Sequence, residues 1–425
     1  MKIAAMITEY NPFHKGHAYH IEKTKEITGA DYCIAVMSGD FVQRGTPAVV
    51  NKYKRAEMAL LSGADAVFEL PLPYAVSSAE YFAGGGVTLL HNLNCIDYLS
   101  FGSECGDLTL LNALADILIL EPDSYKEALA NCLKDGLSYP VARISALQAA
   151  LADSDVSVDS DIPTDFEVST NEINDLLNQP NNILALEYLK ALKQTGSMIS
   201  PVTIKRCGSY HDTDLTAYSS ATAIRKALFE NNQEVFSYLP DAAKDILSNE
   251  PKHGFMDAND FSLLLYYKLL SEKDRGFEAY LDCNREISDK ICKNLSGYRD
   301  FTSFCELLKS KNLTFARISR VLLHILLNLK TPDDFTKSIS ERSLSVPYAR
   351  LFGFRKQSAP LLNHLKKQSR IPLISNLPGS FNLLEDDGAK MLRQNIDASC
   401  LYEAVYASKC GTEALNEYLR SPIIL

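Results

Sequence analysis

The first hundred residues alternate short, apolar-rich runs with longer stretches in which apolar residues recur at helical spacing. The short runs have the length of buried strands, and the longer stretches have the length of helices. Strands are expected at 2–7, 32–37, 66–69 and 96–101, with helices to about residue 28 and over about 52–62 and 77–93. A repeated strand–helix–strand order is typical of a parallel sheet with helices on both faces. The pattern therefore predicts an α/β fold with a parallel, Rossmann-like sheet, whose ligands bind beyond the carboxyl ends of the strands.

The second hundred residues continue this pattern around one polar interruption. Residues 153–170 hold six acidic side chains and no basic one, which predicts a solvated surface loop. A helix is expected near 182–194 and a strand near 202–206. Ser219 or Ser220 then stands where the N-cap of a further helix is needed.

Beyond about residue 235 the strand signal fades, and helical spacing dominates as far as Leu329. Short apolar segments return from Tyr348, in ARLFGF and RIPLIS, and predict a final α/β element. Three parts are therefore expected: an α/β domain over 1–235, a mainly helical, partly basic region over 236–345, and a small C-terminal α/β element over 346–425.

The composition is that of an ordinary globular protein, with 46% hydrophobic and 23% charged residues among 425. No apolar run reaches the roughly 18 residues that a membrane-spanning helix needs, so no membrane association is expected. The N-terminal MKIAAMITEYNPF becomes polar too soon for a secretory signal. Ten cysteines include no C-x-x-C pair and no cluster at zinc spacing, which favours reduced thiols in a cytoplasmic protein and predicts no metal site.

The formal net charge of −10 is unevenly distributed along the chain. Residues 299–370 carry fourteen basic and five acidic side chains, so this stretch has a net charge of +9 and the remainder −19. Such asymmetry is expected where one region binds a polyanion. A solvated helical face would give the same pattern, so charge alone leaves both interpretations open.

The strongest local signal is N-P-F-H-K-G-H at residues 11–17, between the first expected strand and the first expected helix. Gly16 lets the backbone approach a ligand closely. A helix that begins near His17 directs N–H groups and a positive dipole toward an anion. The imidazoles of His14 and His17 can donate hydrogen bonds to phosphate oxygens whose charge grows during reaction. We therefore predict a phosphate site here, without a Walker-type loop; the alternative is a loop with surface histidines.

Two motifs resemble the signatures of one superfamily. TEYNPFHKGH (residues 8–17) resembles the HIGH-type motif of nucleotidylyltransferases, which holds the α- and β-phosphates of ATP. SSATAIR (residues 219–225) resembles their ISSTxIR motif, which grips the triphosphate from the other side. Their order and their separation of about 200 residues make the pair much more specific than either motif alone. The resemblance implies a nucleotidylyltransferase-type sheet.

Further stretches resemble one family along nearly the whole chain, the bacterial tRNA(Met) cytidine acetate ligases. They are MSGDFVQRGTPAVVNKYKRAEMALLSGADAVFELP, YLSFGSE, PNNILALEYLKAL, RCGSYHD and LTFARISRVLLHILL. The resemblance implies that ATP activates acetate as acetyl-adenylate. The acetyl group would then pass to N4 of the wobble cytidine of elongator tRNA(Met). Asn51 departs from the family, which more often has Asp there, and is assigned no role.

Carried onto this sequence, the resemblance implies an ATP site with two catalytic histidines, His14 and His17. The implied ATP-binding residues are Ile7, Thr8, Glu9, Tyr10, Asn11, Pro12, Phe13, His14, Lys15, Gly16, His17, Ala18, Tyr19, His20, Gly102, Asn181 and Arg206, with Asn182 as a competitor for Asn181. Candidates for triphosphate contacts are Ser219, Ser220, Thr222 and Arg225, with Lys15 and Lys226 beside them. Mg²⁺ is expected to bridge the phosphates, ligated mostly by water.

Five residues near these motifs have more than one candidate role. Asp40 can orient a histidine or bind a metal, and Gln43 and Arg44 can contact the substrate or the RNA. Lys52 and Arg55, three apart on one expected helix, form either a substrate-facing pair or a solvated pair.

The basic stretch acquires an expected use from the implied RNA partner, because basic side chains can track the phosphates of an anticodon arm. Arg317 and Arg320 lie on one helical turn beside an apolar stripe, and they join Lys366 and Lys367 as candidate tRNA contacts. Two other classes remain open. One is a nucleotidylyltransferase that adenylylates a small phosphorylated metabolite, and the other is a non-catalytic ATP- and RNA-binding protein.

Overall fold

The structure is a computed structural model that describes residues 1–425 apart from 138, 154–169, 207–219, 252 and 332–343. Ser219 and all but the ends of the expected acidic loop lie outside the described residues. Within the described ranges, every helix is too short or too polar to cross a bilayer.

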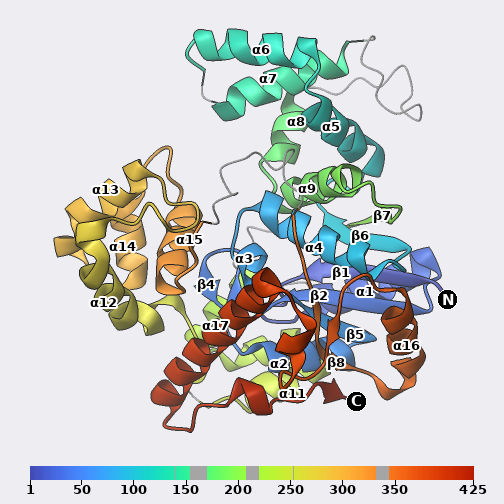
Figure 1. The fold of residues 1–425 in the computed structure, drawn as a ribbon. Helices are drawn as coiled ribbons and strands as arrows, with labels where there is room; N and C mark the ends of the chain where they lie inside the picture. Colours follow the sequence, from blue (N-terminus) through green and yellow to red (C-terminus); the bar gives the residue numbers. More distant parts are fainter. Residues whose placement is uncertain (138, 154–169, 207–219, 252, 332–343) are drawn as a thin grey trace.

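One mostly parallel sheet organises the molecule (Figure 1). Its strands follow the order β10-β8-β5-β2-β1-β6-β7, and β9 pairs with β8. Their bounds are β1 (Ile3–Thr8), β2 (Tyr32–Ser38), β5 (Ala66–Leu70), β6 (Tyr98–Ser103), β7 (Ser200–Lys205), β8 (Ala349–Phe354), β9 (Leu373–Ile374) and β10 (Ile423–Ile424). The five strands from β5 to β7 are parallel, which confirms the predicted α/β class. The direction of strand addition reverses at β1, so a ligand crevice is expected at the carboxyl ends of β1 and β6.

Helices cover both faces of this sheet. The described α-helices are α1 (Lys15–Thr28), α2 (Lys52–Leu61), α3 (Leu72–Ala75), α4 (Ala79–Leu93), α5 (Leu108–Leu120), α6 (Asp123–Lys134), α7 (Tyr139–Leu151), α8 (Thr170–Leu177), α9 (Pro180–Gln194), α10 (Ala221–Phe229), α11 (Asp241–Ser248), α12 (Ser262–Glu272), α13 (Arg285–Asn294), α14 (Phe301–Leu308), α15 (Phe315–Leu326), α16 (Ala359–Gln368) and α17 (Asp386–Cys410). Along β1, Ile3, Ala5 and Ile7 face a core shared with α4, α5 and α9. Ala4 and Met6 face the opposite core, shared with α1, α2, α10 and α11. Both faces are buried, which explains why the strands are apolar throughout.

Polar side chains determine where key helices begin. Asn51 accepts a hydrogen bond from the backbone N–H of Lys54 at 3.0 Å and caps α2. Ser220 accepts one from Ala223 at 3.1 Å and caps α10, as the sequence predicts. Thr314 caps α15 in the same way. Each cap satisfies an N–H that lacks a partner inside its helix.

Helices α12 to α15 form a region with its own apolar core (Figure 1). A second apolar cluster joins this region to the segments that follow β2 and β5 and to α17, with Phe41 and Val76 from those segments, Leu323 from α15 and Tyr402 from α17. His324 is fully buried at this junction, and its two ring nitrogens lie 2.7 Å and 2.8 Å from the carbonyl oxygens of Leu281 and Val76. The histidine that interrupts an apolar run in the sequence is therefore an interior polar link.

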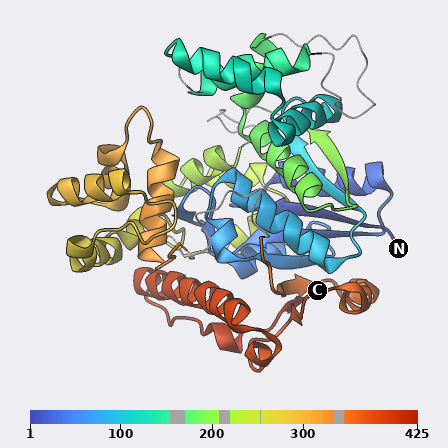
Figure 2. The ribbon, with the colours of Figure 1, turned by 45° about the horizontal axis from the view of Figure 1, so that its top comes forward.

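The C-terminal segment completes the sheet. Strand β8 pairs antiparallel with β5, and β10 pairs parallel with β8. The sequence predicts a small α/β element here, and the structure adds its strands to the main sheet, where β8 covers an edge that β5 would otherwise expose. Helix α17 runs along the helical region and the sheet (Figure 2). The division into three domains stays a prediction.

Replacing His324 with Ala is expected to lower the free energy of unfolding by about 2–4 kcal/mol, because it removes the ring N–H donor to a buried carbonyl group and opens a cavity. Chemical denaturation measures this loss. His253→Ala is the matched control, since His253 is exposed and its replacement should change stability by at most about 0.5 kcal/mol. Equal effects of the two substitutions would contradict the role of His324 as a link.

Candidate functional site

A cavity of about 270 Å³ lies at the carboxyl ends of β1, β6 and β7. The hairpin formed by β3 (Phe41–Val42) and β4 (Thr46–Pro47) closes another side of it. The cavity wall includes these predicted site residues: Ile7, Thr8, Glu9, Tyr10, Asn11, His14, Gly16, His17, Tyr19, His20, Gly102, Asn181, Arg206, Ser220, Thr222 and Arg225. Both motifs thus meet at one cavity, although some 200 residues separate them in the chain.

Four residues of the predicted ATP segment do not line the cavity. Pro12 and Phe13 are buried behind it, and Ala18 packs on the apolar core beneath α1. The Nζ of Lys15 turns away and donates to the carbonyl oxygen of Ser237 at 3.1 Å. Lys226, the other candidate lysine, is exposed and lies outside the wall.

Both motif histidines cap α1, and this fixes which ring nitrogen carries the proton. His14 is the N-cap, and its Nδ1 accepts a hydrogen bond from the backbone N–H of Gly16 at 3.1 Å. The Nδ1 of His17 accepts one from the backbone N–H of His14 at 3.3 Å. Because each Nδ1 is an acceptor, each neutral ring carries its proton on Nε2. Two Nε2–H donors are therefore free of the capping bonds, on rings stacked with centroids 3.6 Å apart.

The histidines of the cavity are held neutral. Desolvation lowers the pKa of His14 to about 3, and the guanidinium groups of Arg206 and Arg225 act in the same direction. The pKa of His20 falls to about 4 through desolvation and Arg206. Desolvation and the neighbouring His14 lower the pKa of His17 well below its ordinary value. In the neutral rings each Nδ1 can accept its capping bond while the Nε2–H group can donate to a phosphate.

Tyr10 supports the histidines from behind. Its backbone adopts the left-handed region with φ of 49°, which is uncommon for a residue with a bulky side chain. Its buried ring packs edge-on against His17 with centroids 4.8 Å apart, and against Phe13 at the same distance. These contacts fix the orientation of the His17 ring.

The opposite wall distinguishes the two neighbouring asparagines. The Oδ1 of Asn182 is buried and accepts the backbone N–H groups of Glu104 and Cys105 at 2.9 Å and 3.1 Å. Asn181 lines the cavity, and its Nδ2 donates to Glu104 Oε1 at 2.6 Å. Asn181 is therefore placed to contact a ligand, and Asn182 holds the loop after β6.

Gly102 and Arg206 lie side by side on the same wall. A Cβ at Gly102 would lie 3.3 Å from the Cγ of Arg206, so a larger residue would press on this arginine. Arg225 connects the two motifs, because its Nη1 donates to the carbonyl oxygen of Asn11 at 2.6 Å. Burial lowers the pKa of Arg225 to about 10, and the guanidinium of Arg44 adds to this effect.

Arg55 is neither solvated nor part of the cavity wall, so the interpretation of Lys52 and Arg55 as a solvated pair is wrong. Its side chain is 0% exposed and donates to four backbone carbonyl oxygens. Nε donates to Val50 at 3.1 Å, and Nη1 donates to Glu9 at 2.6 Å and to Ser38 at 3.1 Å. Nη2 donates to Gly39. Arg55 thus joins the loop after β1 to the loop after β2.

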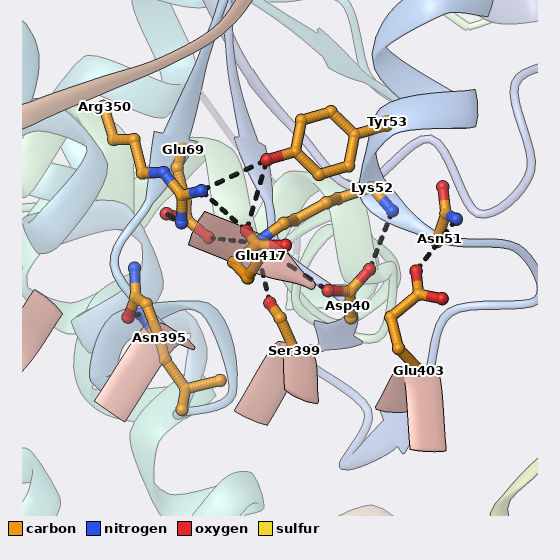
Figure 3. Close-up of polar contacts among 12 residues, drawn as sticks. Asp40, Asn51, Lys52, Tyr53, Glu69, Arg350, Asn395, Ser399, Glu403 and Glu417 are labelled. Carbon is orange, nitrogen blue, oxygen red and sulfur yellow. Dashed lines mark hydrogen bonds and ion pairs between the residues drawn. The ribbon is translucent and has the colours of Figure 1, made fainter. Parts of the chain in front are cut away.

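Lys52 lies in a buried cluster of charges (Figure 3). Its Nζ is 2.5 Å from Glu417, 3.4 Å from Glu69 and 3.8 Å from Asp40. Arg350 also pairs with Glu69 and Glu417, at 3.3 Å and 2.6 Å. Burial raises the pKa of Glu417, but Lys52 and Arg350 lower it by more, so the net result is a pKa of about 2. Asp40 thus faces Lys52, and its Oδ1 also accepts the Lys52 backbone N–H at 2.7 Å.

The sequence gives no signal for this cluster, because its members come from three distant parts of the chain. Asn51, which was assigned no role, caps α2 and donates to Glu403 on α17 at 3.1 Å. Burial and Asp40 raise the pKa of Glu403 to about 7.

The hairpin at the cavity packs directly on the helical region. Gly45 has φ of +78°, and a Cβ there would lie 2.4 Å from the backbone nitrogen of Arg320. The Oγ of Ser319 donates to the carbonyl oxygen of Gly45 at 2.9 Å. Gln43 and Arg44 precede Gly45 and line the cavity. Helix α15 therefore supports the wall of the site.

The candidate tRNA contacts do not form one surface. Helices α15 and α16 lie at opposite sides of the molecule (Figure 1), so the helix that carries Arg317 and Arg320 is far from the helix that carries Lys366 and Lys367. Arg317 pairs with Asp282 at 3.2 Å, and the Nε of Arg320 is buried without a hydrogen-bond partner among the described residues. Of these four residues, the two on α15 are the ones beside the hairpin.

Comparison with known proteins agrees with this geometry. The sequence model of the HIGH nucleotidyl transferases matches residues 1–417. The tRNA(Met) cytidine acetate ligase of Thermoanaerobacter sp. strain X514 is 40% identical over 99% of this chain and 100% of its own. The enzyme of that name from Clostridium perfringens is 38% identical over 100% of both chains. Crystal structures of Thermotoga maritima TmcAL, apo and bound with alpha-thio ATP, are 30% identical over 100% of both chains, with TM-scores of 0.88 and 0.85.

The fold and the paired motifs define a HIGH nucleotidyl transferase. Within that class, the chain belongs to the tRNA(Met) cytidine acetate ligase family.

Gly45→Ala is expected to displace the hairpin from α15, and to lower both stability and turnover with tRNA. Gly29→Ala is the matched control, because Gly29 also has positive φ but no atom within 4 Å of the added Cβ. Backbone strain of about 1 kcal/mol is common to both, so any larger loss for Gly45→Ala measures the contact with Arg320. If the two variants lost the same thermal stability and the same activity, this packing would be refuted.

The neutral histidines predict a pH dependence of stability. Unfolded His20 takes up a proton near its ordinary pKa of 6.5, whereas the folded residue does so near 4. Between these values the unfolded chain binds more protons, so stability falls as the pH is lowered from 7 toward 4. His20→Gln should make this fall shallower in thermal unfolding series. An unchanged slope would show that His20 is not desolvated.

Proposed function

We propose that this protein joins acetate to N4 of the wobble cytidine of elongator tRNA(Met), with ATP as the activating substrate. The observation that carries the proposal is the pair of Nε2–H donors of His14 and His17 at the N-terminus of α1, inside a cavity that both nucleotidylyltransferase motifs line. Membership of a family whose members bear this enzyme name supports the choice of substrates.

In the first step, a carboxylate oxygen of acetate would attack the α-phosphorus of ATP, and the bond to pyrophosphate would break in line. Such a displacement needs alignment and charge stabilisation and little acid–base chemistry. His14 and His17 would donate to the equatorial oxygens, and Arg206 and Arg225 would face the phosphates across the cavity. Asn181 would contact the nucleotide from the opposite wall. The product is acetyl-adenylate, a mixed anhydride that already reacts with amines.

Mg²⁺ fits this site as a phosphate-bound ion. Glu9 is the only carboxyl side chain among the described residues that line the cavity, so a cage of protein carboxylates does not form there. Phosphate oxygens and water would therefore supply most of its ligands. Its chemistry would be to neutralise charge on the phosphates.

The RNA would approach from the side of the hairpin and α15. Arg317 and Arg320 lie there, and basic side chains of this kind contact phosphates without reading sequence. A cytidine in a loop can leave the base stack and reach a cavity, which a paired base cannot do.

The test combines the protein with ATP, Mg²⁺, radiolabelled acetate and unmodified elongator tRNA(Met), followed by nucleoside analysis of the RNA. Label in N4-acetylcytidine that depends on ATP is the expected result. AMP and pyrophosphate formation with another acceptor would favour a metabolite nucleotidylyltransferase. The absence of label and of ATP consumption would favour a binding protein.

His14→Ala and His17→Ala are each expected to lower turnover by about 10²–10³-fold, because each removes a donor to the charge that develops in the transition state. His14→Asn separates this effect from capping, since Asn is a good N-cap but lacks the imidazole Nε2–H. It should restore thermal stability without restoring turnover. Wild-type rates in the Ala variants would exclude the proposed site.

A further inference from the structure

We infer that Glu9 is the residue that receives the cytidine, and that its carboxylate accepts the N4 proton during acetyl transfer. The inference rests on the proposed function and extends it to the second half-reaction. In that step the N4–carbon bond forms, the bond between the acetyl carbon and the AMP oxygen breaks, and its electron pair leaves with AMP. One N4 proton passes to the Glu9 carboxylate.

The first argument is the chemistry of the cavity wall. A base is needed because N4 becomes positively charged as it attacks the carbonyl carbon. Glu9 carries the only carboxyl side chain in the described wall. The Nδ1 atoms of His14 and His17 are used for capping, and their Nε2 atoms already carry protons. Burial raises the pKa of the Tyr188 phenol well above its usual range, so this group remains protonated.

The second argument is position. Glu9 follows β1, and its Oε1 accepts the backbone N–H of Gln43 on the hairpin at 2.7 Å. Its Oε2 makes no hydrogen bond with the described residues, so it can accept one from a ligand. Arg55 holds the Glu9 carbonyl oxygen at 2.6 Å, which fixes the backbone beneath the carboxylate. Glu9 thus stands on the hairpin side of the cavity, and the hairpin is the element that α15 supports.

The third argument is recognition. A carboxylate accepts hydrogen bonds and cannot donate them, and the N4 amino group of cytosine is a donor. Uracil presents an oxygen at the same place, which a carboxylate repels. One group therefore selects cytidine and removes its proton.

Glu9→Gln tests this role, because the amide oxygen can keep the bond from Gln43 while the basic oxygen is lost. Two rates are compared: acetate-dependent exchange of pyrophosphate into ATP, and transfer to tRNA from added acetyl-adenylate. The transfer rate should fall by about 10²–10⁴-fold, the usual range for loss of a general base. The fold-loss in the exchange rate should be at least about ten times smaller than the fold-loss in the transfer rate.

Glu104→Gln is the matched control, since it makes the same change at a carboxylate that contacts Asn181 outside the wall. It should lower exchange at least as much as transfer. Glu9→Asp keeps the carboxylate and should retain part of the transfer rate, so it serves as the test if Glu9→Gln does not fold.

Equal losses of exchange and transfer in Glu9→Gln would assign Glu9 to nucleotide or Mg²⁺ positioning and would overturn the inference. Undiminished transfer would overturn it as well. Failure of the proposed function looks different, because the wild-type protein would then show no acetate-dependent exchange.

Discussion

A guanidinium buried beneath the site holds its two principal loops together. Arg55 donates to the backbone carbonyl oxygens of Glu9, Ser38 and Gly39. One side chain therefore binds the backbone at the ends of both β1 and β2. A buried charge is costly unless its hydrogen bonds are satisfied, and here four carbonyl groups satisfy it. Carbonyl oxygens can do this only if both loops keep their conformation. The position of Glu9, of the histidine motif that follows it, and of the hairpin after β2 all depend on this arrangement.

The neighbouring charge cluster extends this constraint to the end of the chain. Lys52 and Arg350 share Glu69 and Glu417, which joins α2 to β5, to β8 and to the final turn (Figure 3). Such a cluster is weak evidence for stability, because desolvation offsets much of the attraction. Removal of one partner is nonetheless costly, since it strands a buried charge. The cluster therefore fixes how the C-terminal segment docks on the sheet.

The helical region is connected to the chemistry by backbone packing. Gly45 and α15 touch without intervening side chains, and the cavity residues Gln43 and Arg44 immediately precede that contact. An RNA that binds α15 would thus bind next to the wall of the cavity. This proximity places the helical region beside the cavity that both motifs line.

Local sequence predicted the five parallel strands, the Ser220 cap and the two superfamily motifs, because strand length, capping residues and motif spacing are properties of neighbouring residues. It could not choose between Asn181 and Asn182, since both stand in the first turn of α9 and only the tertiary structure shows which one faces the cavity. It left Lys52 and Arg55 open between a substrate-facing pair and a solvated pair, because the residues around them are brought together only by folding. The excess of basic residues over 299–370 did not correspond to one basic surface. Arg350 is buried, and α15 and α16 lie at opposite sides of the molecule. The sequence by itself determined the fold class and the two motifs that identify the superfamily. The partners of each buried charge were decided only by the tertiary structure, because electrostatic contacts depend on distance in space and not on distance along the chain.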